Sequence, residues 1–363
     1  MKTAYRYLSY ELKKNLLRTV IFTVISVVLC LMVMRSEATT GDVQWRSTGI
    51  YMLAIVIGVL ATVMPMLELS EFKNRRNLDT LYFFPIERKK LALVHYLSGL
   101  IQVAAIYTVT FAVSFIFLLL NTDCFALGYM IPYYFASLGT GFVMYSFFSF
   151  TFNQGNTVTD GVIISLLWAF VAYCVLHLGT DVMFGQVIYL NSSEYRELRR
   201  LYKEVYGLSD WGIVYAPINN VTVIFQNAIE VNRHRADYVF ENTSAYGYIK
   251  QWYMFAVWGV AGIVSAVGFI FSFARKGAHM AGELSSSWFG YKTLIPVYGY
   301  SIILYLASFG SNGTLFILTL IMMFIGYVIY RRSFKLKKSD IIVLACSIVP
   351  FILGLFIKNM YPF

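Results

Sequence analysis

Nine apolar stretches dominate the sequence and constrain its fold more than any other feature. Each is close to the roughly 20 residues that a helix needs to cross the hydrocarbon core of a bilayer. Hydrophobic residues make up 58% of the 363 residues and charged residues only 13%, whereas soluble domains carry about 25% charged residues. We therefore predict an all-α, polytopic integral membrane protein. The predicted spans are residues 16–34, 49–67, 91–120, 130–152, 157–179, 252–273, 294–309, 315–330 and 341–357.

The seventh and eighth stretches are short, and only residues 310–314 separate them. A helical hairpin buried in protein could replace two full spans there. Eight spans and nine spans therefore both stay open.

Basic residues are distributed unevenly between the two ends of the predicted spans. With a cytoplasmic N-terminus, the short inner segments 1–18, 68–90, 274–292 and 331–340 hold nineteen Lys and Arg, and the short outer segments hold three. This bias predicts a multi-pass protein of the cell membrane with its N-terminus inside. Much of the net charge of +10 then reflects the orientation of the chain in the membrane, and the basic residues also contact anionic membrane lipids. We expect no nucleic-acid partner.

Residues 68–90 contain ten charges together with several large apolar side chains. Helical spacing up to the residue before Pro85 places Phe72, Asp79 and Tyr82 on overlapping faces. Pro85 disfavours helix at the residue before it and turns the chain toward the third span. We predict a short amphipathic helix suited to a groove on a partner protein. A helix that only lies among the lipid headgroups is the alternative.

Three sequence features carry a resemblance to a known family. In the same loop, Asn77-Leu-Asp79 is followed by Leu81 and then by Pro85-Ile-Glu-Arg88. Residues 5–14 form a basic, aromatic segment just before the first span, and residues 274–283 form a basic segment with Ala and Gly after the sixth. The loop resembles the coupling helix of type-2 ATP-binding-cassette (ABC) exporter permeases. The other two resemble that family's elbow helix and the linker in permeases of operons that respond to cell-wall antibiotics.

The resemblance implies a six-helix permease core in residues 1–273, a cytoplasmic connector in 274–293 and a two-to-three-helix extension in 294–363. It also implies a separate ABC ATPase as partner, a second permease subunit or a homodimer, and export of an amphiphilic, peptide, lipid or cell-envelope compound linked to antimicrobial resistance. The residues expected to couple the permease to the ATPase are Glu71, Arg75, Arg76, Leu78, Asp79, Leu81, Tyr82, Pro85 and Arg88.

Motifs for catalysis and for metal binding are absent from the sequence. It contains no Gly-rich phosphate-binding loop, so ATP is expected on the partner ATPase, and its four His form no His-Glu-x-x-His pair. Arg18 and His95 are expected to reach the cytoplasmic face by snorkelling, and Asp160 to cap the fifth span. We therefore expect no enzyme activity, no metal and no cofactor on this chain.

Residues 180–250 form a segment far longer than a connection requires, and helical spacing predicts that it folds. An extracytoplasmic gate or vestibule and a cap that only shields helix ends are both compatible with it. For the whole chain, a polytopic membrane enzyme acting on lipid or peptide and a membrane sensor or scaffold without transport are the alternatives to the exporter.

Overall fold

The computed structural model of the 363-residue chain describes residues 2–40, 46–74, 86–121, 127–171, 252–276, 282–283, 285, 287–308 and 313–360. Within these ranges the regular elements are helices, and there is no strand. Seven helices are long and apolar enough to cross a membrane, which confirms the predicted all-α, multi-pass fold. They are Leu16–Arg35, Met52–Lys73, Arg88–Leu120, Met130–Gln154, Trp258–Arg275, Gly313–Arg331 and Lys338–Lys358.

These seven helices match seven of the nine predicted spans. The fifth predicted span is described only as the shorter apolar helix Val158–Val171, since residues 172–179 lie outside the described ranges. The seventh corresponds to α12 (Tyr291–Ser308), which has 18 residues and is not among the seven candidates. The last is one span made of two helices, α14 (Lys338–Cys346) and α15 (Ile348–Met360), which join at Ser347.

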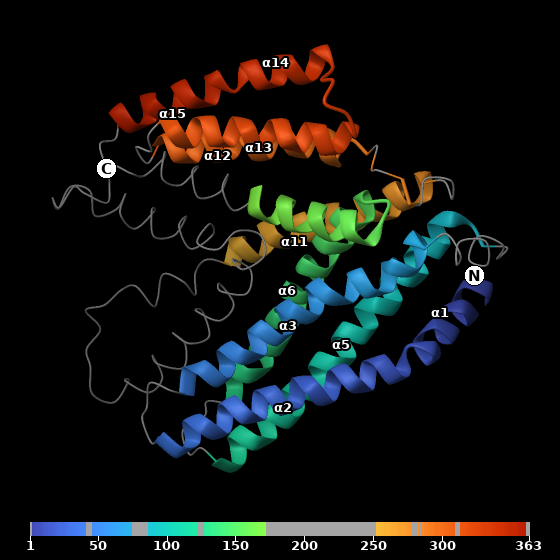
Figure 1. Ribbon diagram of the computed structural model, residues 1–363. Helices are drawn as coiled ribbons and strands as arrows, with labels where there is room; N and C mark the ends of the chain where they lie inside the picture. The colour runs from blue at the N-terminus through green and yellow to red at the C-terminus, as the bar shows by residue number, and fades with distance from the viewer. Residues whose placement is uncertain are drawn as a thin grey trace. The chain divides into compact units, whose positions relative to one another are not determined.

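The chain divides into two compact units. The described residues of the first unit form seven elements, which Figure 1 shows in blue, cyan, green and amber. The elements are α1 (Lys2–Lys14), α2 (Leu16–Thr40), α3 (Arg46–Ser70), the 3-10 turn η2 (Glu71–Lys73), α5 (Arg88–Asn121), α6 (Leu127–Gln154) and α11 (Trp252–Arg275).

Helix α5 is the centre of the first unit, because α1, α2, α3 and α11 all pack against it. Tyr145 of α6 also reaches α5 at Gly99. A Cβ atom at Gly99 would lie 2.2 Å from the hydroxyl oxygen of the fully buried Tyr145, so glycine leaves room for the end of this side chain.

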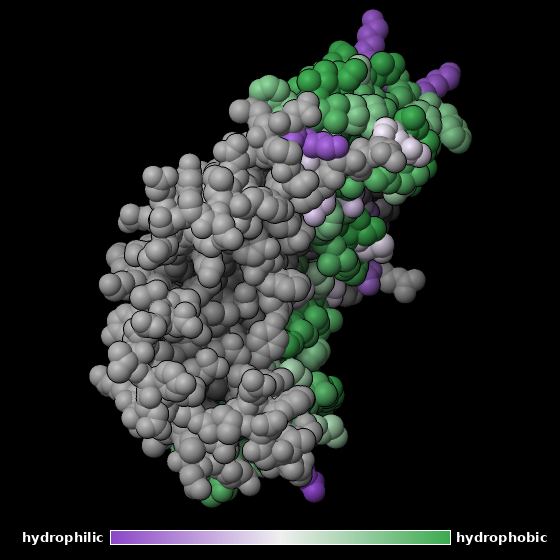
Figure 2. Space-filling view, turned by 90° about the vertical axis from the view of Figure 1, so that its left-hand side faces the viewer, coloured by the Kyte–Doolittle hydropathy of each residue, from purple (hydrophilic) through white to green (hydrophobic). Residues whose placement is uncertain are grey.

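The outer surface of α2 is apolar, as expected for a helix in contact with lipid. Leu17, Val24 and Met32 are 71%, 56% and 64% exposed. The described residues on the face in Figure 2 are likewise mainly hydrophobic, and hydrophilic side chains are few among them. In water such a surface would be unfavourable, whereas in a bilayer it is matched to its solvent.

The helix ends that flank the predicted inner segments gather at one end of the first unit. Lys14 at the end of α1 contacts Glu71, and Lys73 donates a hydrogen bond of 2.8 Å to the Phe152 carbonyl oxygen near the end of α6. Arg88 at the start of α5 donates to the carbonyl oxygen of Lys276, one residue after α11. Helices α2, α3, α5 and α6 therefore alternate in direction, as membrane spans do.

The second unit contains helix Val158–Val171, α12, α13 (Gly313–Arg331), α14 and α15. Helix α12 packs against α13 and α15. At Gly354 of α15 an added Cβ atom would lie 2.4 Å from the Ala307 Cβ, so glycine permits the close contact of α15 with α12.

Helix Val158–Val171 belongs to this second unit, although the sequence grouped it with the permease core in residues 1–273. Trp168 donates a hydrogen bond to the Phe289 carbonyl oxygen, and Tyr291 donates one of 2.8 Å to Asp160. Thr157 caps the helix through the backbone N–H of Asp160. Asp160 therefore lies in the first turn, as expected, but Thr157 supplies the cap and Asp160 binds α12.

Candidate functional site

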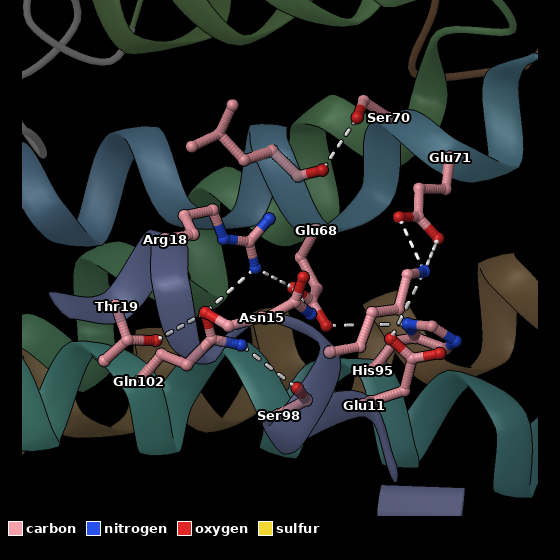
Figure 3. A network of polar contacts seen from close by, with 12 residues as sticks. Glu11, Asn15, Arg18, Thr19, Glu68, Ser70, Glu71, His95, Ser98 and Gln102 are labelled. Atoms are coloured by element: carbon pink, nitrogen blue, oxygen red, sulfur yellow. Dashed lines mark hydrogen bonds and ion pairs between the residues drawn. The ribbon is translucent and has the colours of Figure 1, made fainter. Parts of the chain in front are cut away.

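A buried group of ionisable side chains lies where α1, α2, α3 and α5 meet in the first unit (Figure 3). We call it the polar cluster and define it as Glu11, Arg18, Glu68, His95 and Gln102. Glu11 is 2% exposed, Glu68 3%, His95 0% and Gln102 2%. Buried charges require partners, so every polar atom of such a group has to be accounted for.

Glu68, at the end of α3, is the hub of the polar cluster. Its Oε2 atom accepts a short hydrogen bond from the Arg18 guanidinium and a longer one of 3.4 Å from Asn15. The same guanidinium donates to Gln102 Oε1 at 2.9 Å, and Gln102 Nε2 donates to Ser98. Arg18 therefore links α2 to both α3 and α5.

His95 lies on the other side of Glu68 and is completely enclosed. Its Nε2 atom is 3.2 Å from the Tyr7 hydroxyl of α1, and its ring is 4.5 Å from the Phe72 ring, centroid to centroid. Burial, together with the nearby Glu11 carboxylate, raises the pKa of Tyr7 above its ordinary value. Tyr7 is therefore a neutral phenol at physiological pH, able to donate one hydrogen bond and accept another.

Lys14 and Glu71 form the outer rim of the polar cluster. The Lys14 ammonium lies 2.8 Å from both carboxylate oxygens of Glu71 and 3.8 Å from Glu11. Burial alone would lower the pKa of Lys14, but the hydrogen bond to Glu71 and the two carboxylate charges outweigh it and raise the pKa. Lys14 is consequently charged, and it fastens α1 to the turn that follows α3.

Two of the nine predicted ATPase-coupling residues lie within the described ranges, and both have contacts inside this chain. Glu71 pairs with Lys14, and Arg88 donates a hydrogen bond of 3.1 Å to the Lys276 carbonyl oxygen. The remaining seven lie outside the described residues. They are Arg75, Arg76, Leu78, Asp79, Leu81, Tyr82 and Pro85.

The structure corrects the predicted helix of residues 68–84 at its start. Helix α3 ends at Ser70, η2 occupies Glu71–Lys73, and Asn74 has an extended backbone with φ −96° and ψ 116°. Phe72 turns inward and packs edge-on against the rings of His95 and Phe273. Burial of this ring against two helices outweighs continued helical hydrogen bonding, so Phe72 belongs to the packed interior of the first unit.

The prediction that Arg18 and His95 snorkel to the membrane surface is wrong. His95 has no exposed surface, and Arg18 directs its guanidinium to Glu68 and Gln102. Helices α2, α3 and α5 bring Arg18 to a buried carboxylate that would be costly to leave without a charged partner, and charge-assisted hydrogen bonds hold the two together.

Three atoms of the polar cluster have no hydrogen-bond partner although they are buried: Arg18 Nε, Glu68 Oε1 and His95 Nδ1. The last two face each other at 3.6 Å. One potential ligand atom from each of Glu11, Glu68 and His95 lies within 4.8 Å of the other two, which is close enough for all three to reach one metal ion. No other group of this kind is present in the described part of the chain.

The comparisons with known proteins assign no family to the chain. No model of a protein family matches it, and no curated protein is significantly similar to it.

The residue types in the sequence indicated this site, but their positions along the chain did not show that they meet. Ionisable residues in or beside apolar helices mark functional sites by default, and Arg18, Glu68 and His95 all meet that description. Glu11, Glu68 and His95 come from three helices and are separated by 57 and 27 positions. No local motif can connect them, so only helix packing reveals the cluster.

Proposed function

We propose that this chain is the transmembrane subunit of an ATP-driven ABC exporter, and that ATP is hydrolysed on a separate partner chain. One observation carries the proposal: the loop that resembles a coupling helix is attached on both flanks to the ends of other helices. Before it, Glu71 binds Lys14 of α1 and Lys73 binds the end of α6. After it, Arg88 binds the residue that follows α11.

These attachments suit the transmission of a mechanical signal. A displacement of residues 75–85 by an ATPase would act on α3 and α5 directly and on α1, α6 and α11 through the flanking contacts. Lys276 extends the set, since its ammonium donates to the Asn153 carbonyl oxygen of α6. Rigid helices joined in this way move as bodies, which is the motion that an inward-to-outward transition requires.

Helix α1 supports the same proposal. It precedes the first span as a separate amphipathic helix, with Tyr7 and Glu11 buried against α5 and with Tyr5 and Tyr10 73% and 59% exposed. A separate amphipathic helix before the first span is what the resemblance to the family's elbow helix implies. Its exposed tyrosines suit the headgroup level of a bilayer.

The orientation in the membrane follows from the distribution of charge. We place the end of the first unit that carries Lys14, Lys73 and Arg88 in the cytoplasm of the cell, where the partner ATPase and its ATP are found. Reporters fused after Lys90, Lys292 or Lys338 are expected to be cytoplasmic, and a reporter within residues 191–250 is expected to be outside. An inward reporter in 191–250 would contradict this orientation.

The decisive experiment removes the proposed apolar anchors of the ATPase. In the double variant Leu78→Asp/Leu81→Asp, two carboxylates replace side chains that would fill a groove, so the amount of co-purifying ATPase is expected to fall at least tenfold. The matched control is Phe334→Asp, a change of the same type at an apolar side chain that is 81% exposed in another predicted cytoplasmic segment. Equal recovery of an ATPase with wild type and with the double variant would contradict the proposal.

A second arm separates transport from catalysis. Export of an amphiphilic antimicrobial compound, or resistance to it, is expected to disappear when the partner ATPase loses its phosphate-loop lysine while this chain is unchanged. A membrane enzyme would keep its activity in that background, because its chemistry would lie in its own site. Full activity beside the inactive ATPase would therefore favour the enzyme. The subunit composition of the purified complex shows whether the second permease is a different chain or another copy of this one.

A further inference from the structure

We propose that Glu11, Glu68 and His95 bind one divalent transition-metal ion of the zinc type, and that this ion fastens α1 to α3 and α5. Carboxylate oxygen and imidazole nitrogen are the ligand atoms that Zn²⁺ accepts in proteins beside thiolate. Here they come from three helices, are buried, and lie within 4.8 Å of one another. The site is independent of the ATPase and of the proposed export function.

The distance between the two unpartnered atoms points to an ion and not to a direct hydrogen bond. Glu68 Oε1 and His95 Nδ1 are 3.6 Å apart, beyond the range of an N–H···O bond. Two ligands about 2.1 Å from a tetrahedral Zn²⁺ would lie about 3.4 Å apart. The observed spacing is that of two ligands of one metal ion, and it is also that of a long ion pair if the His95 ring is protonated.

The other atoms of these side chains are already held in the orientation that a metal site needs. Glu68 directs Oε2 to Arg18 and leaves Oε1 without a hydrogen bond. His95 directs Nε2 to the Tyr7 hydroxyl at 3.2 Å, and its Nδ1 faces Glu68 Oε1 without a hydrogen bond. Metal-bound histidines usually donate their second ring N–H to an oxygen, which fixes the tautomer and the ring direction. Tyr7 can accept that N–H and donate its own proton to Glu11, so that the lone pair of Nδ1 is available.

The charges around the site admit a cation. Two carboxylates, Glu11 and Glu68, face the position of the ion, while the single close cation on Glu68 is Arg18. Lys14, at 3.8 Å from Glu11, makes its shorter contacts with Glu71. Protonation of His95 is the alternative to a metal ion, because it would let Nδ1 pair with Glu68 Oε1. The experiment below distinguishes the two.

The test uses the full-length chain purified in mild detergent with an affinity tag that contains no histidine. After the chain is stripped with a chelator and the chelator is removed, titration with Zn²⁺ is expected to show one tight site per chain and a higher midpoint of thermal unfolding. Co²⁺ added instead is expected to give the visible absorption of a bound, low-symmetry ion. Glu11→Gln and His95→Gln are expected to weaken Zn²⁺ binding at least a hundredfold, and Tyr7→Phe about ten- to a hundredfold.

Glu87→Gln is the matched control, because Glu87 is 72% exposed, pairs with Lys90 and lies outside the ligand set, and it is expected to keep wild-type affinity. The wild-type stoichiometry is decisive even if a ligand variant fails to fold: less than one Zn²⁺ per chain would overturn the proposal. Unchanged binding in a folded, monodisperse His95→Gln or Glu11→Gln variant would do the same. The wild-type chain could instead bind no metal and unfold in a pH-dependent way that His95→Gln abolishes. That result would show that the site holds a proton and no metal ion.

Discussion

Among the described residues, two acid–arginine pairs with a buried carboxylate differ in how they are built. In the second unit, Arg331 at the end of α13 binds Asp340 of α14 with two hydrogen bonds of 3.0 and 3.1 Å. The Lys337 backbone N–H and the Ser339 hydroxyl complete the shell around the Asp340 carboxylate. The partners are nine positions apart or fewer, and both carboxylate oxygens are bonded.

The Arg18–Glu68 pair of the first unit is assembled from distant parts of the chain. Its contacts join residues between 50 and 84 positions apart, and Glu68 Oε1 is left without a hydrogen bond. A pair that closes a turn needs only its local neighbours. A pair built by four helices that still leaves buried atoms without a hydrogen bond can accept a further ligand. For that reason we assign a ligand to the site of Arg18–Glu68 and none to the site of Arg331–Asp340.

The largest effect is expected from Glu68→Ala. This change leaves the Arg18 guanidinium buried without its carboxylate and is expected to lower the free energy of unfolding by about 3–5 kcal/mol. The measurement is the thermal midpoint in detergent together with hydrogen exchange in α1, α2, α3 and α5, all of which should lose protection. The double variant Arg18→Met/Glu68→Leu removes both charges and is expected to recover part of the loss. A single variant as stable as wild type would contradict this role for Glu68.

A smaller and local effect is expected from Asp340→Ala. It removes hydrogen bonds to a charged group, at a cost of about 2 kcal/mol, and every partner that it leaves lies within nine positions of Asp340. Faster hydrogen exchange is expected in residues 331–346 and nowhere else in the second unit. The control Lys335→Ala, an exposed change in the same turn, should leave exchange unaltered. Loss of protection throughout α12 and α15 would show that this pair is not local.

The smallest effect is expected from Glu71→Gln. Lys14 and Glu71 are 37% and 32% exposed, so solvent screens their attraction, and the change is expected to cost about 0–1 kcal/mol. Comparing the thermal midpoint of Glu71→Gln with that of Glu68→Ala measures how much less the rim of the polar cluster contributes to stability than its centre. A loss as large as that of Glu68→Ala would place Glu71 among the residues that hold the first unit together.

Most of the fold could be predicted from apolar run length. Seven predicted spans recur as long apolar helices, and α1 recurs as the amphipathic helix before the first span. The limits of this approach appear at short elements. The pattern in residues 68–84 favoured one helix, whereas burial of Phe72 ends it at Lys73 and leaves Asn74 extended.

The sequence alone determined the solvent of this protein and its helical fold class. Continuous stretches of about 20 apolar residues indicate helices in a bilayer, because a helix of that length crosses the hydrocarbon core and pairs each N–H and C=O within its own segment. Which helices meet was decided only by the tertiary structure. The sites of contact depend on close crossings such as Gly354 against Ala307 and on long-range pairs such as Arg18 with Glu68. Glu11, Glu68 and His95 become a site only through that packing, because their separation along the chain exceeds any spacing that a single helix can bring together.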